Sequence, residues 1–443
     1  MTNLIGTSWL RSIGSDTSLA LETGLGLTPG GLVSRPEFFS GVLSRPEIAA
    51  AGILTVADVA TTTYLDLSAL AASRDPVVTA SGDRLRFESF SGCNGVYARF
   101  DLLAEGIASG EVSFGTTNVD VNMPLRGALA ALPPHELMHL AVGRDVLRMS
   151  TLDQTHEERK VALPHRWARG FAEIPTILPG MDLALEANKT QAMAFLAGLP
   201  RGAPGPVVGV APGPRGHRLT GRGARGSATL AGTSRLTSLR RVMRHIRRLT
   251  VWAHDSGASA WAADLDGGRI TLALTPQPYR GFSGEGQLLL ALAGAADAGQ
   301  AASLDPALRV LEHLAWEPRV DPALLAAETG MSVSQVHDGI AVLAASGKVG
   351  YDLSEAAYFH RELPYDDEAV DRDHPRLRAA RTIVAAGGVA RTDSGFRVRS
   401  HEREHWVTLA DSGASCTCRW YARYRGDRGP CSHILAARLF RDA

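Results

Sequence analysis

The chain has 443 residues, of which 45% are hydrophobic and 21% charged, and its formal net charge is zero. This length accommodates two to four domains of ordinary globular composition, and the neutral balance excludes an overall field that draws the chain to nucleic acid or anionic lipid. It has no run of eighteen apolar residues and no basic-then-apolar leader, so we expect no membrane span and a cytoplasmic protein with reduced thiols.

Residues 1–198 are predicted to form an α/β scaffold. Ser34-Arg35-Pro36-Glu37 recurs as Ser44-Arg45-Pro46-Glu47, and each copy has the Ser, Pro and Glu spacing of a capped helix start. We therefore predict two consecutive helices, the second running to about Tyr64. Alternating apolar and polar residues then predict strands over 85–88 and 96–100.

Three polar stretches beside predicted strands are candidates for a binding surface: residues 115–122, 158–161 and 164–167. Such stretches are more often turns in which Asn, Asp and Thr side chains bond the backbone, and we favour that interpretation. Cys93 lies in the turn between the two strands, where we expect a small buried hydrophobe.

His135-Glu136-Leu137-Met138-His139 has the H-E-x-x-H spacing that, on a helix, places two imidazoles and a general base at a catalytic zinc. Glu157 or Glu158 would be available as a third ligand. Two prolines directly precede His135, however, so a helix would begin at the first ligand, and residues 139–143 fit a short strand equally well. We favour a chance match and keep a zinc peptidase as an alternative.

Residues 199–232 are rich in Gly, Pro, Ala and Arg and are predicted to be a mobile loop or linker, whereas residues 233–300 continue the α/β region. Within that continuation we expect strands over 252–274. A Gly-containing turn at 279–286 then leads into a helix to about Ala296.

A stripe of arginines is predicted on a helix after this loop. Three-and-four spacing places these side chains on one face, with Arg241 beside them: Arg240, Arg244, Arg247 and Arg248. Facing phosphate, the stripe would give salt-sensitive affinity for nucleic acid. Facing water or acidic side chains, it is a solvated surface, which we favour because few aromatic residues are interleaved to stack on bases.

Residues 303–363 are predicted to contain three helices and then a strand hairpin, an order that resembles a winged helix-turn-helix. The third helix, residues 333–345, would be the recognition helix. Its polar side chains include Gln335, His337 and Asp338 but no Arg or Lys, so it is poorly equipped to contact guanine or phosphate. We favour a protein-docking unit over a DNA reader.

The C-terminal region, residues 385–443, contains three of the four cysteines, as Cys416-Thr417-Cys418 and Cys431-Ser432-His433. Three thiols and an imidazole make a closed ligand set for one structural Zn²⁺, with no open position for a catalytic water. Strands over 396–399 and 405–409, a loop over 419–430 and a helix from Ser432 are predicted around it.

This C-x-C…C-x-H pattern resembles the SWIM zinc finger, and the resemblance implies that Cys416, Cys418, Cys431 and His433 are the metal ligands. The whole chain resembles bacterial SWIM-finger proteins encoded beside MoxR-type AAA ATPases and von Willebrand factor A proteins. That resemblance implies an accessory role in which the finger binds a protein or DNA.

The predicted fold is therefore an α+β multidomain chain that ends in a ββα zinc finger. We favour a non-enzymatic zinc-binding adaptor with a protein partner, and keep two alternatives, a DNA-binding regulator and the zinc peptidase. Residues 419–425 interleave cationic and aromatic side chains, which either contact the partner or pack on the rest of the chain: Arg419, Trp420, Tyr421, Arg423, Tyr424 and Arg425.

Overall fold

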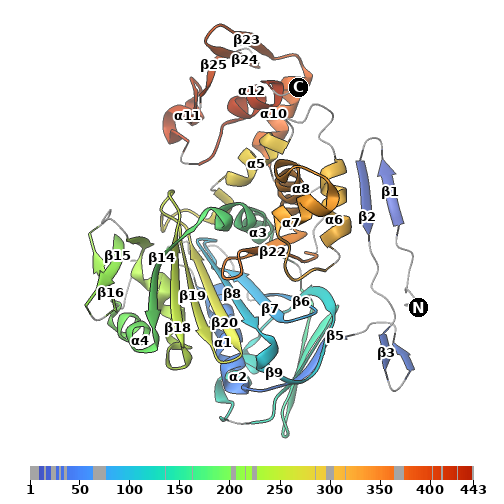
Figure 1. Ribbon diagram of the computed structural model, residues 1–443, viewed down its shortest axis with the longest axis vertical. Helices are drawn as coiled ribbons and strands as arrows, with labels where there is room; N and C mark the ends of the chain where they lie inside the picture. The colour runs from blue at the N-terminus through green and yellow to red at the C-terminus, as the bar shows by residue number, and fades with distance from the viewer. Residues whose placement is uncertain are drawn as a thin grey trace.

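The computed structural model of the chain describes residues 9–13, 16–20, 26–28, 31–33, 37–62, 76–134, 136–161, 163–200, 206–214, 216–221, 227–284, 286–295, 304–314, 316–363, 374–401, 403–410, 413–426 and 428–441. Large β-sheets form the base, a layer of helices lies above them, and a small sheet-and-helix unit forms the C-terminal end (Figure 1). Near the N-terminus, β1 (Trp9–Ile13) pairs with β2 (Asp16–Ala20), and β3 (Gly26–Thr28) with β4 (Gly31–Val33). The mixed α/β class is confirmed.

The larger sheet is antiparallel, with eight strands in the order β10-β6-β7-β8-β20-β19-β18-β14. Its strands are β6 (Val77–Ser81), β7 (Leu85–Phe90), β8 (Val96–Leu102), β10 (Phe114–Asn118), β14 (Asp182–Asn188), β18 (Arg248–Ala253), β19 (Ser259–Leu265) and β20 (Gly268–Leu274). The strands predicted over 85–88, 96–100 and 252–274 all lie in it. At its centre β8 pairs with β20, with Phe100 opposite Ile270, so distant parts of the sequence share one core.

The second sheet has five strands in the order β13-β12-β11-β5-β9. They are β5 (Glu37–Leu43), β9 (Ile107–Val112), β11 (His139–Gly143), β12 (Val146–Ser150) and β13 (Thr155–Arg159). The helix predicted after the first Ser-Arg-Pro-Glu copy is wrong. Ser34 to Pro36 lie outside the described residues, but Glu37 begins β5, where Phe38, Phe39 and Leu43 are buried and pairing with β9 and β11 outweighs the local capping pattern.

The second copy does begin a helix, α1 (Pro46–Thr61), although Arg45 rather than Ser44 precedes its first turn. The helix is largely apolar and packs against β7, β8 and β20. Gly52 permits this approach, because a Cβ there would lie 2.5 Å from the Phe100 ring. The helix α2 (Met123–Ala131) packs on α1, whereas α4 (Lys189–Gly198) packs on β14 and η1 (Ala104–Gly106) lies between β8 and β9 along the chain.

The predicted loop over 199–232 is wrong for the residues that the structure describes there. They form a three-stranded sheet of β15 (Val207–Gly213), β16 (Gly216–Thr220) and β17 (Ala228–Ala231). Val210 and Leu230 are fully buried, so the apolar side chains between the glycines provide enough core for strands.

The arginine-rich helix predicted next is also wrong. The segment consists of η3 (Thr233–Arg240) and η4 (Met243–His245), both 3-10 helices, and Arg248 already belongs to β18. Buried Leu236, Leu239 and Val242 hold these short turns on the core, so the arginines do not share one helical face.

A layer of helices lies between the large sheets and the C-terminal unit (Figure 1). It contains α3 (His165–Ile177), η2 (Leu178–Gly180), η5 (Phe282–Gly284), α5 (Gln287–Ala295), α6 (Leu304–Leu314), α7 (Pro322–Thr329) and α8 (Val333–Ala345). The hairpin β21 (Val349–Asp352) and β22 (Ala357–His360) follows. The helices α6, α7 and α8 and this hairpin occur in the order predicted for residues 303–363. Helix α8 packs on α3, α5, α6 and α7.

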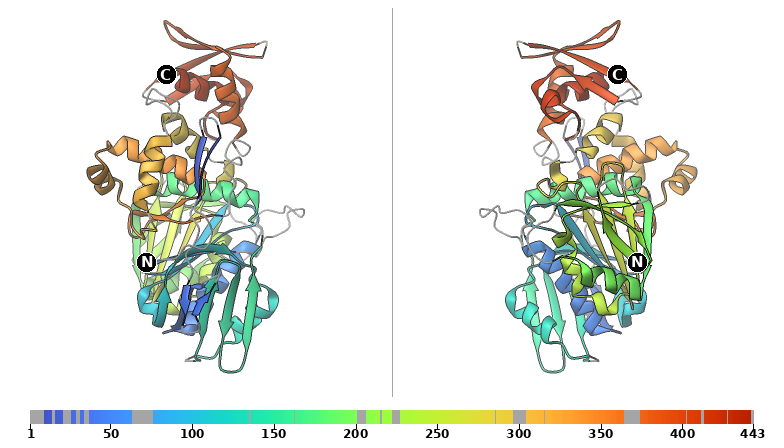
Figure 2. Two further views of the ribbon diagram at one scale, coloured as in Figure 1. Left: turned by 90° about the vertical axis from the view of Figure 1, so that its right-hand side faces the viewer. Right: turned by 90° about the vertical axis from the view of Figure 1, so that its left-hand side faces the viewer.

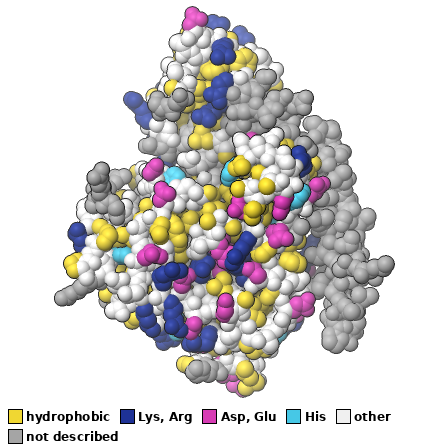
Figure 3. Space-filling view, in the orientation of Figure 1, with side chains coloured by type: hydrophobic (Ala, Val, Ile, Leu, Met, Phe, Trp, Pro, Cys, Tyr) yellow, Lys and Arg dark blue, Asp and Glu magenta, His cyan; other side chains and the backbone are white. Residues whose placement is uncertain are grey.

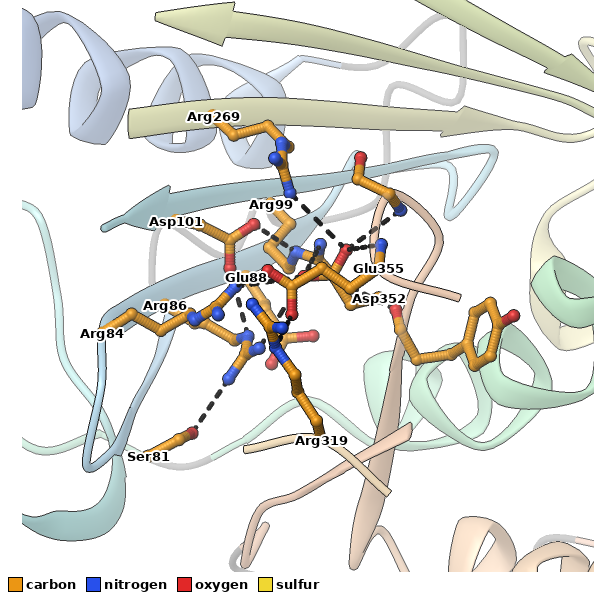
Figure 4. Close-up of polar contacts among 12 residues, drawn as sticks. Ser81, Arg84, Arg86, Glu88, Arg99, Asp101, Arg269, Arg319, Asp352 and Glu355 are labelled. Carbon is orange, nitrogen blue, oxygen red and sulfur yellow. Dashed lines mark hydrogen bonds and ion pairs between the residues drawn. The ribbon is translucent and has the colours of Figure 1, made fainter. Parts of the chain in front are cut away.

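A buried network of ion pairs fastens this hairpin to the eight-stranded sheet (Figure 4). Asp352, at the end of β21, lies 2.9 Å from Arg99 Nη2 on β8 and within 4 Å of Arg84, Arg86 and Arg269. Burial raises the pKa of Asp352, but the four guanidinium groups outweigh it and hold that pKa well below its usual range. Asp101 pairs with Arg86 and Arg99 in the same network, at 3.1 and 2.8 Å.

The C-terminal unit, residues 374–441, projects from the helical layer (Figures 1 and 2). It contains α10 (Pro375–Ala385), the antiparallel strands β23 (Val389–Thr392), β24 (Gly395–Ser400), β25 (Arg403–Ala410) and β26 (Gly413–Cys416), and the helices α11 (Arg419–Tyr424) and α12 (Ser432–Arg441). The two predicted strands and the terminal helix are confirmed. The loop predicted over 419–430 is wrong in its first half, because Cys418 caps α11.

Candidate metal centre

The four predicted ligands come from both ends of the finger. Cys416 ends β26 and Cys418 precedes α11, whereas Cys431 precedes α12 and His433 lies in its first turn. The hairpin β25–β26 and helix α12 hold these two halves together through an apolar core that includes Val407, Ile434 and Leu435. All three cysteines are buried and free of disulfide bonds.

One ligand atom from each of the four residues lies within 4.8 Å of the others. The Cys416 sulfur and His433 Nδ1 are 3.8 Å apart. Zinc bonds of about 2.3 Å to sulfur and 2.0 Å to nitrogen, in a tetrahedron, require ligand atoms to be separated by roughly 3.5–3.8 Å. The donor set and its size therefore fit zinc. Within the described residues, this is the one group of three or more potential ligands that could hold a metal ion.

Backbone amides support the sulfurs. The Cys418, Tyr421 and Ile434 amides donate to the sulfurs of Cys416, Cys418 and Cys431 respectively, each at 3.4 Å. Such N–H···S bonds orient the ligands and favour thiolates, which are the form that binds metal.

The thiols also interact with one another. Hydrogen bonds from Cys416 and Cys431 hold the pKa of the Cys418 thiol well below its usual range. The hydrogen bond with Cys416 lowers the pKa of Cys431, but the one with Cys418 and burial outweigh it and raise that pKa to about 11. The cluster thus already favours one thiolate, and a divalent ion would replace the remaining thiol protons.

The His405 ring packs against the ligand imidazole, with 4.1 Å between the ring centroids of His405 and His433. Burial and then the neighbouring His433 lower the pKa of His405. The His405 ring therefore covers one face of the His433 imidazole. Cys93 takes no part, because it lies in the turn between β7 and β8, with its sulfur 3.4 Å from Ser91 Oγ.

The structure does not assemble the H-E-x-x-H stretch on a helix. His135 lies outside the described residues, residues 136–138 have no regular structure, and His139 begins strand β11, 3.1 Å from Ser40 Oγ. Glu158 on β13 accepts a hydrogen bond from Asn122 at 2.8 Å, and burial, followed by nearby Asp120, raises its pKa to about 7. The polar stretches are not simple turns, because residues 115–118 lie in β10, residues 158–159 in β13 and residues 165–167 in α3. Asn118 does donate to the backbone carbonyl of Val161, so this side chain satisfies a backbone group as expected.

The arginines of the predicted stripe contact acidic side chains and carbonyls instead. Arg241 pairs with Asp58, Arg247 with Asp266 and Arg248 with Asp264, at 2.7, 2.7 and 3.0 Å. Arg240 donates to the carbonyls of Leu196 and Leu199, at the end of α4. Arg244 donates to His245 Nε2 at 2.8 Å. The pairs with Asp58, Asp264 and Asp266 fit the favoured interpretation, a surface that faces water and acidic side chains.

Residues 419–424 form α11, Arg425 follows as its C-cap, and the aromatic side chains of this segment are half-buried. The ring centroids of Trp420 and Tyr424 are 4.6 Å apart, and the Arg376 guanidinium lies 4.6 Å from the Trp420 ring. Arg376 and Trp406 are not among the functional residues predicted from the sequence. Trp406, on β25, is 51% exposed, and its alternation with buried Val407 was the signal that could have identified it.

Comparison with known proteins identifies the finger. Residues 405–439 match the sequence model of the SWIM zinc finger. A comparison with curated proteins found no match. Among the described residues, no helix has the length and apolar character needed to cross a membrane.

Two solved structures resemble part of the chain. Proliferating cellular nuclear antigen from Entamoeba histolytica is 7% identical over 55% of this chain and 100% of that chain, with a TM-score of 0.37. The PCNA2-PCNA3 complex from Sulfolobus tokodaii is 8% identical over 54% of this chain and 99% of that chain, with a TM-score of 0.40.

Proposed function

We propose that this chain, whose residues 405–439 are a SWIM zinc finger, is a non-enzymatic zinc-binding adaptor that recruits a protein partner. The observation that carries the proposal is the closed set of three thiols and one imidazole. Four protein ligands complete a tetrahedral zinc and leave no position for water, so the ion would be structural. Held by Cys416, Cys418, Cys431 and His433, it would supply folding free energy that a unit of this size cannot obtain from its small core.

The recruiting surface would be the outer face of the finger sheet, which we define as Arg397, Arg399, Glu404, Trp406 and Thr408. Strand alternation separates it from the inner face, where Phe396, Val398 and Val407 pack toward α12. On the outer face, Arg397 lies directly across from Trp406 and Arg399 across from Glu404. An exposed Trp beside arginines is the composition of a protein-binding hot spot.

The charge of the C-terminal unit supports an acidic partner. Residues 374–443 contain thirteen arginines and six Asp or Glu residues, although the whole chain is neutral. Figure 3 shows Lys and Arg side chains on the surface of this unit. An acidic segment of a protein, such as the AAA ATPase or von Willebrand factor A protein that the family resemblance implies, would be complementary to it.

Nucleic acid is the second candidate, because the same arginines and Trp406 suit phosphate and base stacking. The winged-helix interpretation adds little support to it. Every residue of β21 and β22 is buried, so the hairpin is not free to serve as a wing. The exposed start of α8 presents Val333, Ser334 and Gln335 and no cation.

Recruitment can be tested by pull-down from the native host with the full chain and three variants. We expect Trp406→Ala and Cys431→Ser to lose a protein that the wild type captures. Leu152→Ala, which removes a 77% exposed side chain far from the finger, should retain it. Equal capture by all four chains would contradict the proposal. A DNA titration at two salt concentrations with a steep salt slope would favour the second candidate instead.

A further inference from the structure

We propose that residues 428–431 form a zinc-dependent joint between the finger and the rest of the protein. Zinc fixes the position of the finger as well as its fold, and Arg376 couples zinc binding to that position. The inference rests on the zinc-binding function proposed above. It concerns the loop that leads into the ligand Cys431, together with α10, which lies outside the matched finger residues.

Arg376 holds this loop directly. Its Nη1 donates to the carbonyls of Arg428 and Pro430, at 2.7 Å each. Gly429, Pro430 and Cys431 are buried, and Arg376 and Arg428 are half-buried, so these hydrogen bonds are partly shielded from water. A charged donor to two carbonyls makes stronger hydrogen bonds than a neutral one. The backbone that presents the third zinc ligand is therefore positioned from α10.

The same loop touches the start of α5. A Cβ added to Gly286 would lie 3.0 Å from Gly429 Cα and 3.1 Å from the Arg428 carbonyl oxygen. The rest of the protein holds this start in place, because the amides of Gly286 and Leu288 donate to the buried Glu173 carboxylate of α3 at 3.0 and 3.1 Å. Helix α12 packs on both α5 and α10. The loop is thus where the finger meets the helical layer.

Arg376 contacts both halves of the ligand set, and this makes the joint metal-dependent. Its guanidinium lies 4.6 Å from the ring of Trp420, on the helix that Cys418 begins, and it bonds Pro430, next to Cys431. A zinc ion held by both halves would fix the distance between them. One guanidinium can contact both only when that distance is maintained, so zinc binding and the Arg376 contacts should stabilise each other.

The test compares zinc affinity by competition with a chromophoric chelator in the full chain. Arg376→Met should weaken zinc binding about tenfold, as is typical when support of a metal ligand is lost. Arg378→Met, an exposed arginine on the same helix, should leave it unchanged. Removal of zinc from the wild type should also accelerate amide hydrogen exchange in α5, which contains none of the ligands.

A pair of glycine variants keeps the test decisive if Arg376→Met fails to fold. Gly286 and Gly387 both have left-handed backbone, at φ +80° and +63°, but a Cβ on Gly387 meets nothing within 4 Å. Only Gly286→Ala should weaken zinc binding. Equal zinc affinities for Arg376→Met and Arg378→Met and for the two glycine variants would overturn the joint but not the proposed function. Amide hydrogen exchange in α5 that is unchanged when zinc is removed would have the same consequence. A wild-type chain that binds no zinc would overturn the proposed function and the joint together.

Discussion

Replacement of Asp352 by Asn tests the buried network that fastens the β21–β22 hairpin to the sheet. Asn has the shape of Asp and can still accept from the amides of Ser354 and Glu355, at 3.0 and 3.4 Å, so the change removes chiefly the negative charge. The Asp352 side chain is 1% exposed and lies 2.9 Å from Arg99. Loss of one partner of a buried ion pair costs about 3–5 kcal/mol, because the other charge stays buried, against a typical total of about 5–15 kcal/mol.

Urea unfolding of the full chain at pH 7, followed by tryptophan fluorescence, measures this loss. The matched control is Asp266→Asn, whose carboxylate is 44% exposed and pairs with Arg247 at 2.7 Å, and which should lose less than about 1 kcal/mol. The folded-state pKa of Asp352 is lowered, so its stabilisation is present above its unfolded pKa and is lost as pH falls through the folded value. Equal unfolding midpoints for the two variants at pH 7 would refute the reasoning.

Three further predictions concern other sites. Burial raises the pKa of Glu158 from 4.5 to about 7. Its protonated form therefore contributes fully to the stability of the folded chain below pH 4.5, and this contribution is lost as the pH rises through about 7. In thermal unfolding at pH 8, Glu158→Gln should stabilise the chain by on the order of 2 kcal/mol, and Glu157→Gln should not. Trp406→Ala should retain zinc in a chelator-release assay while losing the partner, whereas concurrent loss of zinc would show that Trp406 supports the fold. The His139→Ala variant should retain the full zinc content of the wild type. Loss of zinc from this variant would instead support the peptidase alternative.

Local patterns predicted part of the fold. The alternation in 405–409 corresponds to β25, where buried Val407 lies between exposed neighbours. The alternation in 85–88 corresponds to β7 and the apolar run after Pro46 to α1, although every residue of β7 and most residues of α1 are buried. The sequence failed where partners were distant. Glu37 begins a strand because β9 and β11 pair with it, and the glycine-rich segment forms β15 and β17 because Val210 and Leu230 are buried in the main core.

In the candidate site, too, local spacing predicted the residues that are close in sequence but not the contacts between distant segments. The spacing of Cys416, Cys418, Cys431 and His433 predicted a four-ligand group, because short-range order within two C-x-C/H units brings each pair together. The supports could not be predicted in the same way. Arg376 and the start of α5 reach the ligand loop only through tertiary packing, and no local pattern marks an arginine whose partners are carbonyls more than fifty residues away.

The zinc content of the purified full chain, measured by elemental analysis, tests the central claim most directly. We predict one zinc per wild-type chain and per Cys93→Ser chain, and almost none in Cys431→Ser, because Cys93 lies outside the ligand set. Wild-type protein without zinc, or a Cys431→Ser variant that holds as much zinc as the wild type, would contradict the account.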